Sequence, residues 1–432
     1  MAIDRFNTVN ARWTILAPVG LSGGGTLFNQ GTLVIEPDPP GTVEINLPIT
    51  GTTGEFVCGS PARDNAGTVG RFTGPLNVRP APGDVLQNGT WRVHRLAVLD
   101  LGGPPLRRIG RGAKVELAGG TLMPFDPRKN EGRLTLSYSN TSLQAGGDFE
   151  NALSGKMELK DDAAFRVQGA ATNHGSLALT TGATMRVDGA FTQSHTGRLS
   201  LGDFCELILP GGGTIGGIMA GSAGTITGDV TLPGQTSPGS SPGRLTISGR
   251  AAFTPTTVFD AELAGETAGE FDVLNVTGPA VMNGTLAVIL LNGYRPAAAD
   301  TFTIVQAGAM TGSFGNAPHG QRVATVDGYG SFLVSYSATA VVLSAFEANP
   351  APAPSATPQL PAPQILLPES PEPLLSFQLS GTPGWPYLIE SRANLQTWTP
   401  FHAATLSSSG TLTAEFPFDA ATAPRFFRAR AP

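Results

Sequence analysis

Apolar and polar residues alternate in short runs along this chain, and the clearest runs form a repeat. Three similar segments start at Gly155, Gly175 and Gly197, with spacings of 20 and 22 residues (175 − 155 and 197 − 175). Each segment continues with two apolar pairs: Met157/Leu159 with Phe165/Val167, Leu177/Leu179 with Met185/Val187, and Leu199/Leu201 with Leu207/Leu209. A period of two is typical of half-buried strands, whereas an amphipathic helix needs a period of 3.6. The pattern therefore predicts short strands in each repeat.

A repeat of this length cannot bury its apolar face alone and has to stack on its neighbours. Strands stacked about 4.8 Å apart describe a right-handed parallel β-solenoid, which is the fold that we predict. Glycine-rich positions follow the runs, and we expect them at the corners of the coils, where glycine adopts a positive φ at little cost. Ala163, Ala183 and Cys205 share one position of the repeat, which predicts a narrow inward-facing slot.

The pattern divides the chain into three parts. Residues 1–348 are predicted to form the β-solenoid, with regular coils at about 130–235 and a less regular β segment at 244–348. Residues 349–364 are proline-rich and uncharged, as in an extended linker. Residues 365–432 again contain short alternating runs separated by turn sequences, which predicts a small immunoglobulin-like β-sandwich. The expected fold class is all-β throughout.

Composition narrows the class of function. The 432 residues include 56 Gly and 36 Pro and are only 14% charged, which fits a β-rich protein with many turns. The net charge of -6 argues against nucleic acid as the main partner, because such binding needs a basic surface. No run approaches the roughly 18 apolar residues of a membrane-spanning helix, and the N-terminal residues lack the apolar core of a signal peptide.

Several motifs together resemble a group of bacterial proteins. The series NGTWRV, AKVELAGG, GSLALTTGATMRVDGAFTQ, TSPGSSPGRLTISG and FDVLNVTGPAVMNGTLAVIL is similar to autotransporter-like and adhesin-like β-helix proteins of bacterial envelopes, of the planctomycete and verrucomicrobial type, over about residues 20–345. The motifs SGTPGWPYLIESRANLQTWTPF and RFFRAR resemble small β-sandwich domains that end many secreted verrucomicrobial proteins, although those usually have a tyrosine where Phe427 stands. The resemblance implies a secreted or cell-surface protein, and we expect further native sequence to precede Met1.

The stretch GSSPG at residues 239–243 fits the G-x-S-x-G pattern of a serine nucleophile on a sharp turn. That turn is followed by a helix in α/β-hydrolases, but GRLTISG alternates like a strand. The oxyanion hole also uses the backbone N–H of the residue after the serine, and Pro242 has none. We therefore interpret Ser241 as part of two successive Pro-Gly turns and not as a nucleophile.

Histidines and acids indicate two further kinds of site. His174 and His195 are 21 positions apart (195 − 174), about one coil, and stacking would bring them to the same corner. A metal site would need a third ligand, and we favour exposed histidines without a bound metal. Asp161 aligns with Thr181 and then with Asp203, so no ladder of acids of the kind that a glycosidase or a calcium-dependent lyase needs is expected.

Two groups of residues are candidates for contact with a ligand. Arg107, Arg108 and Arg111 belong to a basic stretch that could meet an anionic glycan, although a solvated face is the simpler interpretation. In the tail, Trp385, Tyr387 and Trp398 could form a platform for sugar rings, although aromatic side chains also dominate the cores of small domains.

These patterns predict a structural or adhesive stalk protein without catalytic activity and without a cofactor. Surface glycans or other envelope components are the expected partners. Two alternatives stay open: a carbohydrate-active β-helix enzyme, either a polysaccharide lyase or a glycosidase, and glycan binding by the C-terminal domain alone. Acids or Arg and Lys side chains gathered in one groove would favour the enzyme.

Overall fold

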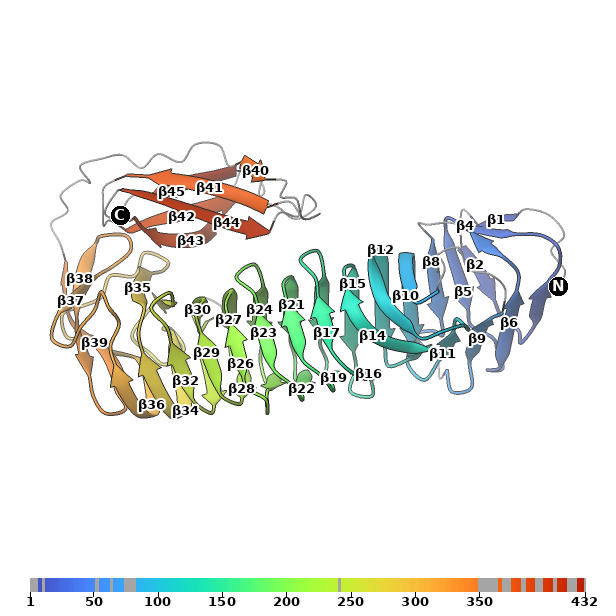
Figure 1. Ribbon diagram of the computed structural model, residues 1–432, viewed down its shortest axis with the longest axis horizontal. Coiled ribbons are helices and arrows are strands. Elements are labelled where there is room, and N and C mark those ends of the chain that lie inside the picture. Colours follow the sequence, from blue (N-terminus) through green and yellow to red (C-terminus); the bar gives the residue numbers. More distant parts are fainter. Residues whose placement is uncertain are drawn as a thin grey trace. The chain divides into compact units, whose positions relative to one another are not determined.

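All regular structure in the described residues is β-strand, which confirms the all-β prediction (Figure 1). The computed structural model describes residues 7–9, 12–50, 54–62, 65–73, 83–239, 242–348, 364–366, 374–381, 386–392, 399–406, 410–417 and 426–430. The chain divides into two compact units, residues 1–192 with 202–211 and residues 193–201 with 212–432. The predicted linker at residues 349–364 lies almost wholly outside the described residues, and the predicted boundaries at residues 348 and 364 stay a prediction.

The first unit is a stack of parallel coils, in which each strand pairs with its counterpart one coil later. One face holds β2 (Arg12–Ile15), β5 (Thr32–Ile35), β8 (Glu55–Cys58), β10 (Val85–His94), β12 (Leu106–Ala118), β15 (Arg133–Ser137), β18 (Lys156–Leu159) and β21 (Ser176–Leu179). A second holds β3 (Gly20–Ser22), β6 (Thr42–Asn46), β9 (Val69–Phe72), β11 (Val98–Asp100) and β13 (Thr121–Met123), and, as a separate group, β16 (Ser142–Ala145), β19 (Ala164–Val167), β22 (Thr184–Val187) and β25 (Glu206–Ile208). The remaining strands are β1 (Asn7–Val9), β4 (Leu27–Asn29), β7 (Ile49–Thr50), β14 (Phe125–Asn130), β17 (Phe149–Asn151) and β20 (Ala171–Asn173).

The second unit continues the same parallel pattern and then changes it. Its parallel strands are β24 (Arg198–Leu201), β26 (Gly213–Ile215), β27 (Ile218–Gly221), β28 (Thr225–Thr227), β29 (Val230–Leu232), β30 (Gln235–Ser237), β31 (Arg244–Ser248), β32 (Ala251–Phe253), β33 (Val258–Leu263), β34 (Val273–Met282), β35 (Thr285–Leu290) and β36 (Phe302–Gly312), and β23 (Phe191–Gln193) spans the division between the units. β37 (Arg322–Ala324), β38 (Gly330–Tyr336) and β39 (Ala340–Ala348) pair antiparallel, and β39 also pairs antiparallel with β36. The solenoid prediction is therefore confirmed for the parallel coils, whereas the last part of the segment 244–348 folds into hairpins.

The tail forms two small antiparallel sheets, in agreement with the predicted sandwich-like fold. One contains β40 (Gln364–Leu366), β41 (Leu374–Ser380) and β44 (Thr411–Pro417), and the other contains β42 (Pro386–Arg392), β43 (Thr399–Thr405) and β45 (Phe426–Arg430). Their core includes Leu379, Tyr387, Ile389 and Leu406, all of them buried.

The predicted apolar pairs form the core of the coils. Leu159 pairs in register with Leu179, and both side chains are fully buried. Phe165 pairs with Met185 on the neighbouring face. The ring of Phe165 packs edge-on against the ring of Phe149, with 5.1 Å between the ring centroids. Burial of each such side chain contributes about 1.5–3 kcal/mol. The alternation thus fixes which side of each strand faces inward.

The glycines that open the repeats have a different role from the one predicted. Gly155 and Gly175 do not adopt a positive φ, whereas the corner residues Asp161 and Thr181 do. A Cβ on Gly175 would lie 2.3 Å from the carbonyl oxygens of Ala152 and Gly155. These glycines are needed because successive coils approach too closely for a side chain, whereas Gly182, next to Thr181, has the positive φ (76°) predicted for a corner glycine.

A row of buried asparagines links three coils. Asn130, Asn151 and Asn173 end β14, β17 and β20, and each is at most 2% exposed. Asn130 Nδ2 donates to Asn151 Oδ1 and Asn151 Nδ2 donates to Asn173 Oδ1, both at 2.8 Å. Asn151 Nδ2 also lies 3.0 Å from the carbonyl oxygen of Ser176. Amides that both donate and accept can satisfy one another in a stack, which allows a polar row inside the solenoid.

Asn151→Ala should destabilise the first unit by about 1–3 kcal/mol, because it leaves buried polar atoms of both neighbouring asparagines without their partner. Urea unfolding followed by circular dichroism measures this change. Asn46→Ala is the control, since Asn46 on β6 is exposed and its substitution should change the unfolding free energy by less than about 0.5 kcal/mol. Equal effects of the two substitutions would contradict the role of the row.

Candidate functional site

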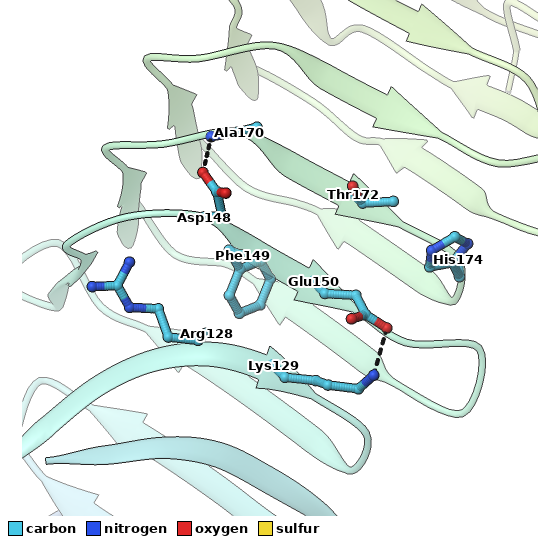
Figure 2. Close-up of a pocket in the computed structure, with 8 residues that line it drawn as sticks. All are labelled: Arg128, Lys129, Asp148, Phe149, Glu150, Ala170, Thr172 and His174. Carbon is cyan, nitrogen blue, oxygen red and sulfur yellow. Dashed lines mark hydrogen bonds and ion pairs between the residues drawn. The ribbon is translucent and has the colours of Figure 1, made fainter.

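A groove of about 660 Å³ lies on the outer face of β14, β17 and β20 in the first unit (Figure 2). It is lined by Arg128, Lys129, Asp148, Phe149, Glu150, Ala170, Thr172 and His174. Strand register brings Lys129, Glu150 and Thr172 into one outward row across three coils. Figure 2 shows His174 on one side of this row and Arg128 on the other side. The groove follows from stacking, because equivalent positions of successive coils share one surface.

The groove carries both signs of charge and both kinds of hydrogen-bonding group. Lys129 Nζ lies 2.8 Å from Glu150 Oε1. Asp148 Oδ1 accepts the backbone N–H of Ala170 at 2.9 Å, which ties two coils together. Thr172 adds a hydroxyl that can donate and accept. Such a surface can bind a polar ligand of low net charge, such as a chain of sugars, through several weak contacts.

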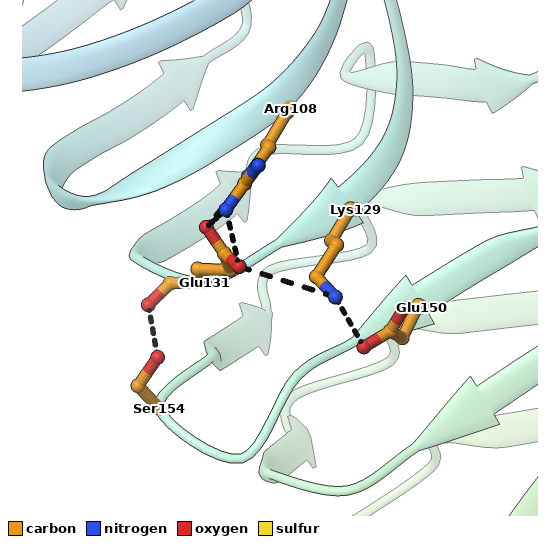
Figure 3. Close-up of polar contacts among 5 residues, drawn as sticks. All are labelled: Arg108, Lys129, Glu131, Glu150 and Ser154. Atoms are coloured by element: carbon orange, nitrogen blue, oxygen red, sulfur yellow. Dashed lines mark hydrogen bonds and ion pairs between the residues drawn. The ribbon is translucent and has the colours of Figure 1, made fainter. Parts of the chain in front are cut away.

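An ion-pair network extends from the groove to the preceding coil (Figure 3). Arg108 donates from Nε and Nη2 to the two carboxylate oxygens of Glu131, each at 2.7 Å. Lys129 Nζ lies 3.9 Å from Glu131 Oε1, and the hydroxyl of Ser154 donates to the Glu131 carbonyl at 2.7 Å. The network therefore places each cation against an anion from another strand or coil.

The same neutralisation occurs on other faces of the first unit. Arg92 lies between Glu55 and Glu116, at 2.7 and 2.6 Å. Arg166 and Arg186 share Asp188, at 2.7 and 2.6 Å, and their hydrogen bonds lower the pKa of that carboxyl. Each exposed pair contributes at most about 1 kcal/mol. Their main effect is a surface on which unlike charges alternate.

The predicted register of polar residues agrees with the structure. Arg166 pairs with Arg186 and Arg186 with Ile208, as the repeat alignment requires. Thr184 pairs with Glu206, which places Asp203 opposite Thr181. No group of three or more His, Cys, Asp or Glu side chains in the described residues is arranged to hold a metal ion.

The candidate arginines occupy surface positions on β12. Arg107 Nη1 lies 2.5 Å from Asp126 Oδ2, and Arg108 is held by Glu131. Arg111 is exposed. Arg107 and Arg108 are thus already paired with acids, and an anionic ligand would have to compete with those carboxylates.

The candidate aromatic residues of the tail are not gathered on a described surface. Tyr387 is fully buried in the core of the small domain, so its ring is not available as a platform for sugars. This corrects the interpretation of Tyr387 as a ligand contact, because its whole side chain is packed inside the domain. Trp385 and Trp398 lie outside the described residues.

The remaining predictions concern residues that the structure separates or leaves out. His174 belongs to the first unit and His195 to the second, so their pairing stays a prediction. Ser241 lies outside the described residues, and its role as a turn residue also stays a prediction.

Sequence reasoning missed the groove because it missed the third strand of each coil. β17 and β20 are three residues long and carry a single inward apolar side chain before their asparagine. A recurring amide side chain shortly before each repeat-opening glycine (Asn151, Asn173 and Gln193) was the available signal.

Comparisons with protein-family models, with curated proteins and with solved structures gave no match. The described part of the chain contains no helix that is long and apolar enough to cross a membrane.

Both cysteines are buried and have a raised thiol pKa. Burial raises the pKa of Cys58 to about 12, and its Sγ lies 3.3 Å from the carbonyl oxygen of Val98. Cys205 is 2% exposed, and Ala183 and Ala163, one and two coils away in the repeat, are fully buried, in agreement with the predicted slot. Because thiolates and not thiols react, both side chains should be inert in the folded protein.

Neither cysteine should react with a maleimide at pH 8 in the native protein, and both should react in denaturing urea. Mass spectrometry of the labelled protein counts the modified thiols. Rapid labelling of Cys58 without urea would show that the coil around it opens.

Proposed function

We propose that this protein is a non-catalytic structural or adhesive protein of the bacterial exterior, in which stacked coils form a rigid support. The observation that carries the proposal is the coil-to-coil pairing of outward charges in the first unit. Arg92, Arg108 and Lys129 each contact a carboxylate of a neighbouring strand or coil. Such pairing favours a stable surface over a reactive one. Two carboxyl groups that act as catalytic acid and base need environments that give them different pKa values. The resemblance of the repeats to envelope proteins supports the location.

The adhesive part of the proposal rests on the groove across β14, β17 and β20. Its donors and acceptors repeat with the spacing of the coils, about 4.8 Å, which is comparable with the length of one sugar unit. A polysaccharide strand lying along the stack would meet Lys129, Glu150 and Thr172 in succession. We propose surface glycans of low charge as the ligand class. Glycan binding is the second candidate function, and the groove across β14, β17 and β20 is the observation that favours it.

The full chain should bind at least one neutral polysaccharide of a panel without releasing products from it. Surface plasmon resonance with immobilised protein measures binding, and reducing-end and unsaturated-product assays on the same polysaccharides measure cleavage. Binding should depend little on salt, because the groove is close to neutral. Release of shortened products would contradict the non-catalytic proposal and favour the β-helix enzyme.

Thr172→Arg should weaken that binding by at least about tenfold, equivalent to about 1.4 kcal/mol, because the longer side chain fills the groove. Thr184→Arg is the matched control, since Thr184 lies on β22, outside the groove, and has Glu206 as its register partner. Equal binding by both variants would place the glycan elsewhere on the chain.

A further inference from the structure

A row of three cations crosses successive coils on the face of the first unit that holds β12, β15 and β18. Lys114 pairs in register with Arg133, and Arg133 pairs with Lys156. The residue that follows each of these cations is buried, so alternation along the strands points the three charged side chains outward. Parallel pairing spaces them about 4.8 Å apart. Three positive charges are thus lined up along the stack, one on each coil.

Uncharged residues bound the row at both ends. Thr90 is the register partner of Lys114 one coil earlier, and Ser176 is that of Lys156 one coil later. Both are partly exposed, and a hydroxyl group can donate to and accept from the hydroxyl groups of a sugar. The row is therefore a short cationic strip that continues at each end into neutral hydrogen-bonding groups.

These cations lack the neutralising acids that other cations of the unit have. Neither Lys114 nor Arg133, both of them exposed, makes an ion pair with another described residue. Elsewhere on the same face, Glu116 lies opposite Arg92 and contacts it at 2.6 Å. Like charges opposite one another on neighbouring strands destabilise a sheet. Because Lys114 and Arg133 keep this unfavourable arrangement without an acid between them, it points to an external partner of opposite charge.

Acids lie on both sides of the row, but they already contact cations outside it. On one side, Glu131 precedes β15, and Arg108 donates to both of its carboxylate oxygens (Figure 3). On the other side, Glu158 Oε1 on β18 lies 4.0 Å from Lys160 Nζ, and Glu116 on β12 contacts an arginine of the preceding coil. These acids confine the unneutralised positive charge to a narrow strip along the row.

We propose that Lys114, Arg133 and Lys156 form a binding site for a linear acidic polysaccharide that carries a carboxylate on each sugar unit. The length of a sugar unit is comparable with the spacing of the coils, so successive units meet successive cations when the chain lies along the stack. A guanidinium group binds a carboxylate through two parallel hydrogen bonds, and an ammonium group binds it as a point charge. The site is separate from the groove across β14, β17 and β20 and does not rest on the glycan binding proposed there.

The narrow strip favours a single thin chain over a nucleic-acid duplex. Duplex DNA carries about one charge per 1.7 Å of its axis on two strands. Its width would bring phosphates over Glu116, Glu131 and Glu158, which flank the row and repel them. A single polysaccharide chain needs only the strip itself, and this is the partner to which the arrangement of charges points.

Isothermal titration calorimetry of the full chain with sodium polygalacturonate tests the site, and the methyl ester of the same polymer is the control without charge. At low salt the acid form should bind at least about tenfold more tightly than the ester. Its log Kd should rise with log salt with a slope of up to about two, since each of three contacts contributes about 0.7 for a single-stranded polyanion. No binding of the acid form, or equal binding of acid and ester, would overturn the proposal.

Arg133→Gln removes the central charge and should weaken binding of polygalacturonate by about tenfold, because a charge-assisted contact is lost. The salt slope should fall by about 0.7. Arg71→Gln is the matched control, since Arg71 on β9 lies on another face, where it contacts Glu44 and Asp100. This control changes the net charge equally but should alter the Kd by less than about twofold, because salt screens distant charges.

Equal weakening by the two variants would show a general attraction between charges and would overturn the site. Lys114→Gln is a second variant of the row and should act in the same direction as Arg133→Gln. Tighter binding of single-stranded DNA than of polygalacturonate would also overturn the proposal, in favour of a nucleic-acid site. A neutral polysaccharide held in the groove should bind Arg133→Gln as it binds the wild type, so the two binding proposals fail separately.

Discussion

The backbone pairing between successive coils is the constraint on which the rest of the structure depends. Strands of three to five residues cannot hold an apolar face in place alone, so each is fixed by the counterpart one coil away. Parallel pairing at about 4.8 Å then decides which side chains become neighbours. Gly155 and Gly175 exist where that spacing brings backbone oxygens too close for any Cβ. The core, the corners of the coils and the groove all follow from this one pairing register between the strands of successive coils.

The same register gives the inward and outward rows different chemistry. Inward rows stack identical or similar groups, which suits apolar side chains and also asparagine, because an amide can donate to one neighbour and accept from the other. Outward rows cannot stack identical charges without repulsion, and the first unit pairs unlike charges, as in the register partners Arg92 and Glu116. Where Arg166 and Arg186 do stack, Asp188 lies between their guanidinium groups. The surface is thus shaped by the need to avoid like neighbours, except in the row of Lys114, Arg133 and Lys156.

The alternation of apolar residues was enough to predict the coils, their register and the inward position of Cys205, because two paired apolar positions identify a strand without ambiguity. It was not enough for β17 and β20, where one apolar residue and one buried asparagine give no alternation. The groove depends on those strands and was therefore missed. The hairpins β37–β39 were also missed, since an antiparallel strand has the same period as a parallel one.

Tyr387 shows a different limit: an aromatic residue in a short β domain suits a core and a sugar platform equally well until its burial is known.

The second unit shows why a sequence motif can coincide with a catalytic one. A nucleophile turn needs two glycines close in sequence because its backbone passes very near another group, and the glycines of GSSPG have the same spacing. In this chain that group is the buried carboxyl of Asp272, which occupies the space beside Gly239 and accepts the N–H of Gly243. Several acids of the first unit, such as Glu116 and Glu131, contact cations, whereas Asp272 contacts backbone N–H groups and lies near another acid. Backbone N–H groups that donate to both oxygens favour the carboxylate form of Asp272, whereas burial and the neighbouring acid Glu262 oppose its charge.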